Sequence, residues 1–533
     1  MAWNLAISEE QFDNLYPELL EYKHIFKTDF KSDKDFIENY LTSKLWRLNN
    51  LYTIIDKNGD RIPFVMNLSQ HKVYSASLEH PRLIILKSRQ QGISTFWLIS
   101  FFDDAIFNDD LNIGLMAQGA DEASTLLERV KFYWDTLDDN IKDFLGIAND
   151  KDNAKAFSFT NNSTMFIRTS FRSATLQRMH ISELGKIANK YPEKAKETNT
   201  GTLQAVGAGN TVVIESTAEG NNMFKDKWDS AVNLNHVYAP KDFKPLFLSW
   251  LDDPDCRTTV RQDIAPKQRE YFEKLEAELG IAITQPQRWF WVMQYRELGD
   301  DIYQEYPSTP EEAFSAVREG TYYARNYRQH VIKNSREKED LYDPNLPVDV
   351  VMDLGMNDEF VLGFWQYFDG CDRLIHEYTN SGEGLEHYVN YINEQAAERG
   401  YDIGVTVVPH DINVKELGTG ISRKARLREL GVRKLKVLPK LSIADGIEAV
   451  RKLIPKLWID KECSYTRDCM LNYSKEWDEA RQNWKNTPLH DKWSHGADMV
   501  RYRAISRPEY RVQTKSNVQK RTKVSYNRGM SID

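Results

Sequence analysis

A short apolar run, a glycine turn and a second apolar run follow one another early in this chain. Residues 83–86 (Leu-Ile-Ile-Leu) have the composition of a buried strand, and the polar loop after them turns at Gly92. Ser94 and Thr95 then open an apolar, aromatic run to Phe107 that predicts a helix. A strand, a tight loop and a helix N-terminus in this order direct backbone N–H groups and the positive end of the helix dipole to one point. The stretch therefore predicts a phosphate-binding loop in an α/β domain.

This loop departs from the usual pattern G-x-x-x-x-G-K-[ST]. Gly92 and Ser94 match the second glycine and the hydroxyl, but Ile93 stands at the lysine position and Lys87 at the first glycine. Either the loop is only a strand-to-helix turn, or its positive charge has moved to the front. Lys87 and Arg89 are the two cations there, and the sequence does not decide which one reaches phosphate. The candidate nucleotide-binding residues of the loop are Lys87, Ser88, Arg89, Gln90, Gln91, Gly92, Ile93, Ser94 and Thr95.

The size and charge of the chain exclude several classes of protein. At 533 residues the chain is too long for one core, so two or three domains are expected. No apolar run reaches membrane-spanning length, and the first residues lack the pattern of a secretory signal. The four cysteines form no C-x-x-C motif, which indicates reduced thiols. The net charge of −9 argues against coating nucleic acid through overall charge, although local basic patches remain compatible with DNA binding.

Hydrophobic patterning predicts two α/β domains. Segments 82–86, 112–117, 179–182 and 211–216 have the character of parallel strands with helices between them. From residue 347 the pattern changes to three antiparallel strands (348–354, 360–367 and 373–378), followed by a helix (384–399), a strand (405–409), a helix (423–430), a strand (434–438) and a helix (443–457). This is the βββαβα order of a ribonuclease-H-like domain, with further elements after it. We expect a helical segment (1–50), a first α/β domain (51–250), a connecting subdomain (251–345), the ribonuclease-H-like domain (346–506) and a basic tail (507–533).

Three further stretches fit a nucleotide site. Gln70 precedes the loop, and its amide offers the donor and the acceptor that an adenine edge requires. Glu183 ends an apolar strand, where an acid serves a metal ion or orients the attacking water. Glu215, Ser216 and Thr217 end another strand and are placed to sense the γ-phosphate and couple its hydrolysis to movement.

In their order these motifs resemble the terminase large subunit of tailed bacteriophages, an ATP-driven motor that packages viral DNA. The resemblance runs from about residue 50 to residue 504 and implies a P-loop ATPase domain with a parallel-type sheet, followed by a nuclease domain. The family sometimes displaces the loop cation to the front, as Lys87 and Arg89 suggest. Ser182 stands where many ATPases have a metal-binding aspartate, which leaves Glu183 as the acid at that strand end. The matching stretches are residues 63–70, 87–95, 180–183, 215–218 and 303–314.

A second set of acids lies in the ribonuclease-H-like region. Asp353 ends its first strand, Asp411 follows its fourth strand, and Asp498 lies on a late helix three residues after His495. Three converging carboxylates bind two divalent cations that clamp the attacking and leaving oxygens in phosphodiester cleavage, and oxygen ligands favour Mg²⁺ or Mn²⁺. The same residues resemble the terminase nuclease motifs. His495 is a candidate metal ligand or proton carrier, and a structural histidine explains it about as well.

The resemblance also implies cofactors and partners. These are ATP with Mg²⁺, two metal ions in the nuclease site, double-stranded DNA, the portal ring of the procapsid and the terminase small subunit. It further implies a homo-oligomeric ring on the portal, with a monomer in solution as the alternative, and a place in the host cell cytoplasm but not in the mature virion or a membrane. Arg129, Arg172 and Arg178 are candidates for an arginine that stabilises transition-state charge. The competing hypotheses are a helicase-nuclease of repair or restriction type and a non-enzymatic assembly protein with an inactive nucleotide fold.

Overall fold

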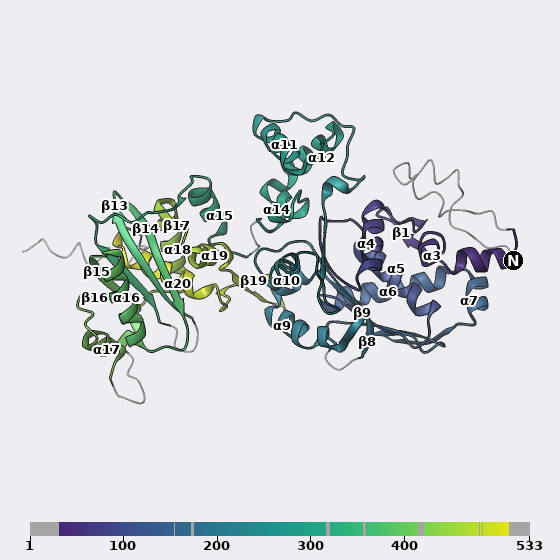
Figure 1. The fold of residues 1–533 in the computed structure, drawn as a ribbon, viewed down its shortest axis with the longest axis horizontal. Coiled ribbons are helices and arrows are strands. Elements are labelled where there is room, and N and C mark those ends of the chain that lie inside the picture. Colours follow the sequence, from purple (N-terminus) through teal and green to yellow (C-terminus); the bar gives the residue numbers. More distant parts are fainter. Residues whose placement is uncertain are drawn as a thin grey trace, which may run out of the picture. The chain divides into compact units, whose positions relative to one another are not determined.

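The chain forms two compact units, Met1–Ala316 and Val317–Asp533, each described here by itself. The computed structural model (Figure 1) describes residues 31–153, 155–171, 175–315, 320–354, 359–413, 421–478, 480–481 and 483–510. Most of the predicted N-terminal helical segment and of the basic tail lie outside these residues, as does Arg172. No helix in the described part of the chain is both long and apolar enough to cross a bilayer.

The first unit is built on an eight-stranded sheet. Its strands from β10 to β7 run parallel, and β6 and β5 extend the sheet as antiparallel strands. The four strands predicted from apolar runs are β3, β4, β8 and β9. In sheet order the strands are β10 (Lys244–Leu248), β3 (Arg82–Lys87), β9 (Val206–Ser216), β8 (Leu176–Ser182), β4 (Asn112–Met116), β7 (Thr164–Arg168), β6 (Ala156–Phe159) and β5 (Asn149–Asn153).

Both faces of this sheet are covered, because alternate residues of its central strands enter two different cores. Leu83 and Ile85 of β3 pack with the helices before β3 and the apolar helix after the loop, whereas Ile84 and Leu86 pack on the other side. The helices of the first core are α2 (Asp33–Phe36), α3 (Lys44–Asn50), α4 (Leu68–Glu79), α5 (Ile93–Phe107), α6 (Ala120–Thr136) and α7 (Asp139–Leu145). Those on the other side are α8 (Leu184–Lys190), α9 (Pro192–Thr200) and α10 (Met223–Val232).

Smaller elements flank this sheet. A hairpin with its turn near residue 58 is formed by β1 (Thr53–Ile55) and β2 (Arg61–Pro63). The helices after β10 have a core of their own around Trp250 and Trp291. They are α11 (Pro266–Leu279), α12 (Gln285–Leu298), α13 (Ile302–Glu305) and α14 (Pro310–Ser315).

The second unit is built on a seven-stranded mixed sheet. β13 is antiparallel to both of its neighbours, whereas β15 lies parallel to β12 on its other side. The five predicted strands are present, and β11 and β17 extend the sheet beyond them. In sheet order the strands are β11 (Glu337–Lys338), β17 (Leu457–Asp460), β14 (Cys371–Asn380), β13 (Phe360–Phe368), β12 (Val348–Asp353), β15 (Ile403–Val408) and β16 (Leu435–Val437).

Helices cover both faces of this second sheet as well. Val350 and Met352 of β12 pack under α16 and α17, and Val351 packs under α18, α19 and α20. Tyr323 and Tyr327, which we expected in a connecting subdomain, pack in the core that contains Val351. The helices are α15 (Ala324–Tyr327), α16 (Leu385–Arg399), α17 (Arg423–Glu429), α18 (Ile443–Leu453), α19 (Ser464–Asn472) and α20 (Ser494–Ser506), and a hairpin of β18 (Lys475–Asp478) and β19 (Asn483–Pro488) lies before α20.

One predicted helix is shorter than expected. The sequence predicted a helix over residues 443–457, but α18 ends at Leu453. Pro455 lies in a short 3-10 turn, and Leu457 already begins β17. The proline lacks the N–H that an α-helix would need there, so the prediction of a helix to residue 457 was wrong.

Candidate nucleotide and nuclease sites

The loop between β3 and α5 has two residues in the left-handed backbone region. Gln90 has φ 66° and Gly92 has φ 70°. A Cβ atom at position 92 would lie 2.8 Å from Nε2 of Gln70. That Nε2 donates to the Gly92 carbonyl (2.9 Å), and Oε1 of Gln70 accepts from the Asn67 N–H (2.9 Å) as part of the capping box of α4. Gln70 therefore braces the loop in this structure, and its contact with adenine stays a prediction that would require an exchange of these bonds.

Gly92 is the position where a side chain should disturb the loop most. We expect Gly92→Ala to lose about 1–2 kcal/mol from the left-handed backbone and, in addition, to push Gln70 away and weaken nucleotide binding. Gly146 is the matched control, because it has φ 61° but open space around a Cβ atom. Thermal unfolding and binding of a fluorescent ATP analogue measure the two effects. Equal nucleotide affinity in Gly92→Ala and Gly146→Ala would contradict this role of the Gly92–Gln70 contact.

Lys87, at the end of β3, points into the site. Its side chain is buried, and Nζ lies 3.1 Å from Oε1 of Glu183 and 3.7 Å from Oε2 of Glu215. Burial alone would lower the pKa of Lys87, but the two carboxylates outweigh it and raise the pKa above its ordinary value. Arg89 differs, because its side chain is 57% exposed and its guanidinium lies 3.3 Å from Oε2 of Glu305. The sequence did not decide whether Lys87 or Arg89 reaches phosphate. In the structure Lys87 contacts Glu183 and Glu215, whereas Arg89 pairs with Glu305.

Glu183 lies directly after β8 in the left-handed backbone region, with φ 56°. Burial favours its neutral form, yet Lys87 and Lys186 lower the pKa of Glu183 below its ordinary value. Nζ of Lys186 lies 3.4 Å from the second carboxylate oxygen, and the Thr217 hydroxyl donates to that oxygen at 3.4 Å. Glu183 is therefore an ionised acceptor at neutral pH, as a residue that orients a water molecule must be.

Glu215, predicted as a coupling residue, is fully buried in the centre of this cluster. Its Oε1 accepts hydrogen bonds from the hydroxyls of Ser94 and Ser182 (3.2 Å to Ser182) and lies 3.1 Å from Nε2 of His180. Burial opposes ionisation, but Lys87 and the hydrogen bond from His180 lower the pKa of Glu215 to about 2. The sequence indicated a strand end here, but it gave no sign that this carboxylate meets the loop.

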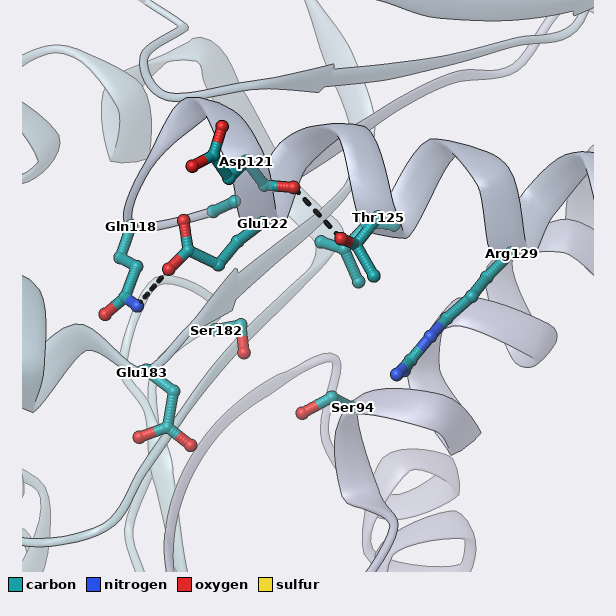
Figure 2. A pocket seen from close by; sticks show the side chains of 10 residues that line it. Ser94, Gln118, Asp121, Glu122, Thr125, Arg129, Ser182 and Glu183 are labelled. Atoms are coloured by element: carbon teal, nitrogen blue, oxygen red, sulfur yellow. Dashed lines mark hydrogen bonds between the residues drawn. The ribbon is translucent and has the colours of Figure 1, made fainter. Parts of the chain in front are cut away.

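A pocket of about 340 Å³ opens beside these residues. Ser94, Ser182 and Glu183 line one side, and α6 lines the other (Figure 2). Arg129 extends from α6 into this pocket toward Ser94. Arg178, another candidate for the transition-state arginine, instead pairs with Asp104 at 3.0 Å. Of the candidates within the described residues, Arg129 is the one placed at the pocket.

The second candidate site lies at the carboxyl ends of β12 and β15. These strands are parallel neighbours, with Val351 opposite Val407, so Asp353 and the turn that contains Asp411 lie at the same edge. Helix α20 adds His495, whose Nδ1 lies 3.2 Å from Oδ2 of Asp353. The structure thus brings residues together that are far apart in the sequence.

The electrostatics of this edge suit a cation. Burial raises the pKa of Asp353 above its ordinary value, although the contact with His495 and the charge of Arg501 act in the opposite direction. Burial also raises the pKa of Asp498 to about 6, although Arg501 pairs with its Oδ2 at 2.9 Å. The other oxygen, Oδ1 of Asp498, is buried without a hydrogen-bond partner among the described residues. A buried carboxylate oxygen of this kind fits a divalent ion.

The predicted metal-ligand set is not assembled in the described part of the chain. No group of three or more His, Cys, Asp or Glu side chains there is arranged to hold a metal ion. Asp411 is exposed on its turn, whereas Asp353 is buried. Binding of two ions by Asp353, Asp411 and Asp498 therefore stays a prediction, and so does the role of His495.

Comparisons with known proteins add the following findings. No family model and no curated protein match the chain. Among solved structures, the large terminase of a thermophilic bacteriophage is 14% identical, with 83% of this chain and 99% of that chain covered and a TM-score of 0.31. The chain is similar to large terminases.

Two further solved structures contain a bound nucleotide or a bound metal ion. A structure of the same thermophilic phage's large terminase in complex with ADP is 14% identical over 82% of this chain and 98% of that chain, with a TM-score of 0.30. The large terminase nuclease domain of bacteriophage SPP1 with bound manganese is 14% identical over 31% of this chain and 92% of that domain, with a TM-score of 0.24. The assignment of sites in this chain rests on its own geometry.

Proposed function

We propose that this chain is a viral DNA-packaging motor with two activities. ATP hydrolysis in the first unit drives translocation of double-stranded DNA into a procapsid, and a metal-dependent endonuclease in the second unit cuts the concatemeric genome. The observation that carries the proposal is a combination of two clusters in one chain. In the first, Lys87 of the phosphate loop contacts Glu183 and Glu215. In the second, Asp353 at the end of β12 lies near Asp498 of α20.

The ATPase part of the proposal assigns roles to the residues around the loop. The loop N–H groups and Lys87 bind the phosphates, Ser94 faces Mg²⁺, and Glu183 orients the attacking water. Arg129, in the pocket beside Ser94, stabilises the charge that develops in the transition state. Mg²⁺ neutralises phosphate charge when it is bound. Ser216 and Thr217 are placed to couple hydrolysis to movement, because the Ser216 hydroxyl accepts from the Gly185 N–H at 3.0 Å and Thr217 contacts Glu183.

The nuclease part assigns Asp353, Asp411 and Asp498 as ligands of two Mg²⁺ or Mn²⁺ ions. Such ions clamp the attacking and leaving oxygens of the phosphodiester. His495, in contact with Asp353, orients that carboxylate. The basic residues at the start of α17 provide phosphate contacts near this edge.

The competing hypothesis of a helicase-nuclease requires a second motor domain. Residues 251–315, all described, fold into helices with their own core and contain no strand. This region therefore offers no second nucleotide-binding sheet. The paired and ionised acids at the loop also disfavour an inactive assembly protein, since buried charges are costly to keep without a use. The portal ring, the small subunit, a ring of copies and a site of action in the host cytoplasm remain parts of this proposal.

The proposal is tested with the purified full chain. We expect ATP hydrolysis that double-stranded DNA stimulates, and cutting of plasmid DNA that requires Mn²⁺ or Mg²⁺ and stops with a chelator. Hydrolysis without any response to DNA, or cutting that survives chelation, would contradict it.

The choice between Lys87 and Arg89 gives a sharper prediction. We expect Lys87→Met to abolish most ATP hydrolysis, because it removes the buried cation that contacts both carboxylates, whereas Arg89→Met should keep much of the activity. Steady-state hydrolysis measures the difference, and thermal unfolding checks the fold of Lys87→Met, since loss of one partner of a buried pair costs about 3–5 kcal/mol. If both variants remain active, this loop does not bind phosphate in the way proposed here.

A further inference from the structure

The end of β8 lacks a residue that this kind of site normally has. Phosphate-loop ATPases hold Mg²⁺ with the Ser or Thr of the loop and an aspartate at the end of a neighbouring strand. This chain has Ser182 at that position, and a serine hydroxyl carries no charge. The acid after it, Glu183, pairs with Lys87 and Lys186, and the proposed function assigns it to the attacking water.

The neighbouring strand supplies a carboxylate at the same place. β9 lies between β3 and β8, with Glu215 opposite Ser182 on one side and opposite Ile85 on the other. A glutamate at this register reaches the loop, and its Oε1 accepts from both Ser94 and Ser182.

We propose that Glu215 takes the place of the missing aspartate and positions the Ser94 hydroxyl for Mg²⁺. This inference rests on the proposed ATPase function and deepens it. Nζ of Lys87 lies 3.7 Å from Oε2 of Glu215, and the Glu215 side chain is fully buried. The site thus keeps the negative charge that an aspartate would bring but takes it from β9 instead of β8. Glu215 acts as a positioning residue through Ser94. The proposed coupling role stays with the two residues after it, because Ser216 contacts Gly185 and Thr217 contacts Glu183.

The test is the Mg²⁺ dependence of nucleotide binding rather than turnover. The affinity of the full chain for a fluorescent, non-hydrolysable ATP analogue is measured with Mg²⁺ and with chelator, and the ratio of the two affinities is compared. We expect Glu215→Gln and Ser94→Ala each to lower this ratio roughly 10- to 100-fold, the range for residues that orient a metal ligand. Glu219→Gln is the matched control. Glu219 is also buried and lies four residues after Glu215, but its Oε2 accepts from Nδ2 of Asn189 at 3.4 Å.

A rescue separates positioning from a purely structural role. Adding Ser182→Asp to Glu215→Gln should restore most of the Mg²⁺ effect, because it returns a carboxylate to the end of β8. An unchanged ratio in Glu215→Gln, or no recovery in the double variant, would overturn the inference. If thermal unfolding shows that Glu215→Gln does not fold, Ser94→Ala is used as the test variant. A wild-type ratio of the two affinities in Ser94→Ala would then overturn the inference. A wild-type chain that binds the analogue without any Mg²⁺ effect would instead overturn the proposed ATPase function itself.

Discussion

Glu183→Gln is expected to lower DNA-stimulated ATP hydrolysis by roughly 10²- to 10⁴-fold, the contribution of a positioned acid-base group. The substitution keeps the size of the side chain but removes the charge that Lys87 and Lys186 hold at the end of β8. Nucleotide affinity should change much less, because the loop backbone and Lys87 remain. Initial rates of phosphate release and analogue binding measure the two quantities.

The matched control for this variant is Glu193→Gln, an exposed glutamate on α9. It should hydrolyse ATP like the wild-type chain. If Glu183→Gln hydrolyses ATP at the wild-type rate while correctly folded, Glu183 does not orient the water, and another residue of the pocket must do so.

Asp353→Asn is expected to reduce metal-dependent plasmid cutting by about 10³-fold, which corresponds to several kcal/mol of lost metal assistance. Asp353 ends β12 and is buried against His495, so an amide there has neither the charge nor the second acceptor oxygen that a divalent ion requires. ATP hydrolysis should stay close to that of the wild-type chain. Agarose gels of plasmid incubated with Mn²⁺ measure the cutting.

Asp369→Asn provides the control for this prediction, because Asp369 is exposed in the turn between β13 and β14. It should cut plasmid normally. Wild-type cutting by Asp353→Asn would show that the nuclease site does not use Asp353 and lies elsewhere in the chain.

Local patterns were sufficient to predict the central strands of both sheets. Apolar runs such as residues 83–86 form strands because they fill a core on both faces, and the positions of Asp353 and Glu183 at strand ends follow from that. The order of strands in a sheet is different, because it depends on contacts between distant segments. The meeting of Glu215 with Ser94 requires β9 to lie beside β3, and no spacing in the sequence encodes this.

Two other features depended on side-chain detail. The difference between Lys87 and Arg89 is one of burial, since both are cations at the front of the loop. Lys87 ends β3 and its buried side chain contacts Glu183, whereas the exposed Arg89 pairs with Glu305. Gln70 is a case where a local signal was available. Asn67 followed three residues later by Gln70 is a capping-box pattern, which predicts a helix start as readily as it fits an adenine contact.

A crosswise measurement of both activities shows whether this chain carries two separate catalytic sites. ATP hydrolysis and Mn²⁺-dependent plasmid cutting are followed in parallel for the wild-type chain, Glu183→Gln and Asp353→Asn. Glu183→Gln is expected to lose hydrolysis and still cut plasmid, while Asp353→Asn is expected to lose cutting and still hydrolyse ATP. Two separate catalytic sites would be contradicted if either folded variant loses both activities, or if both variants keep both activities.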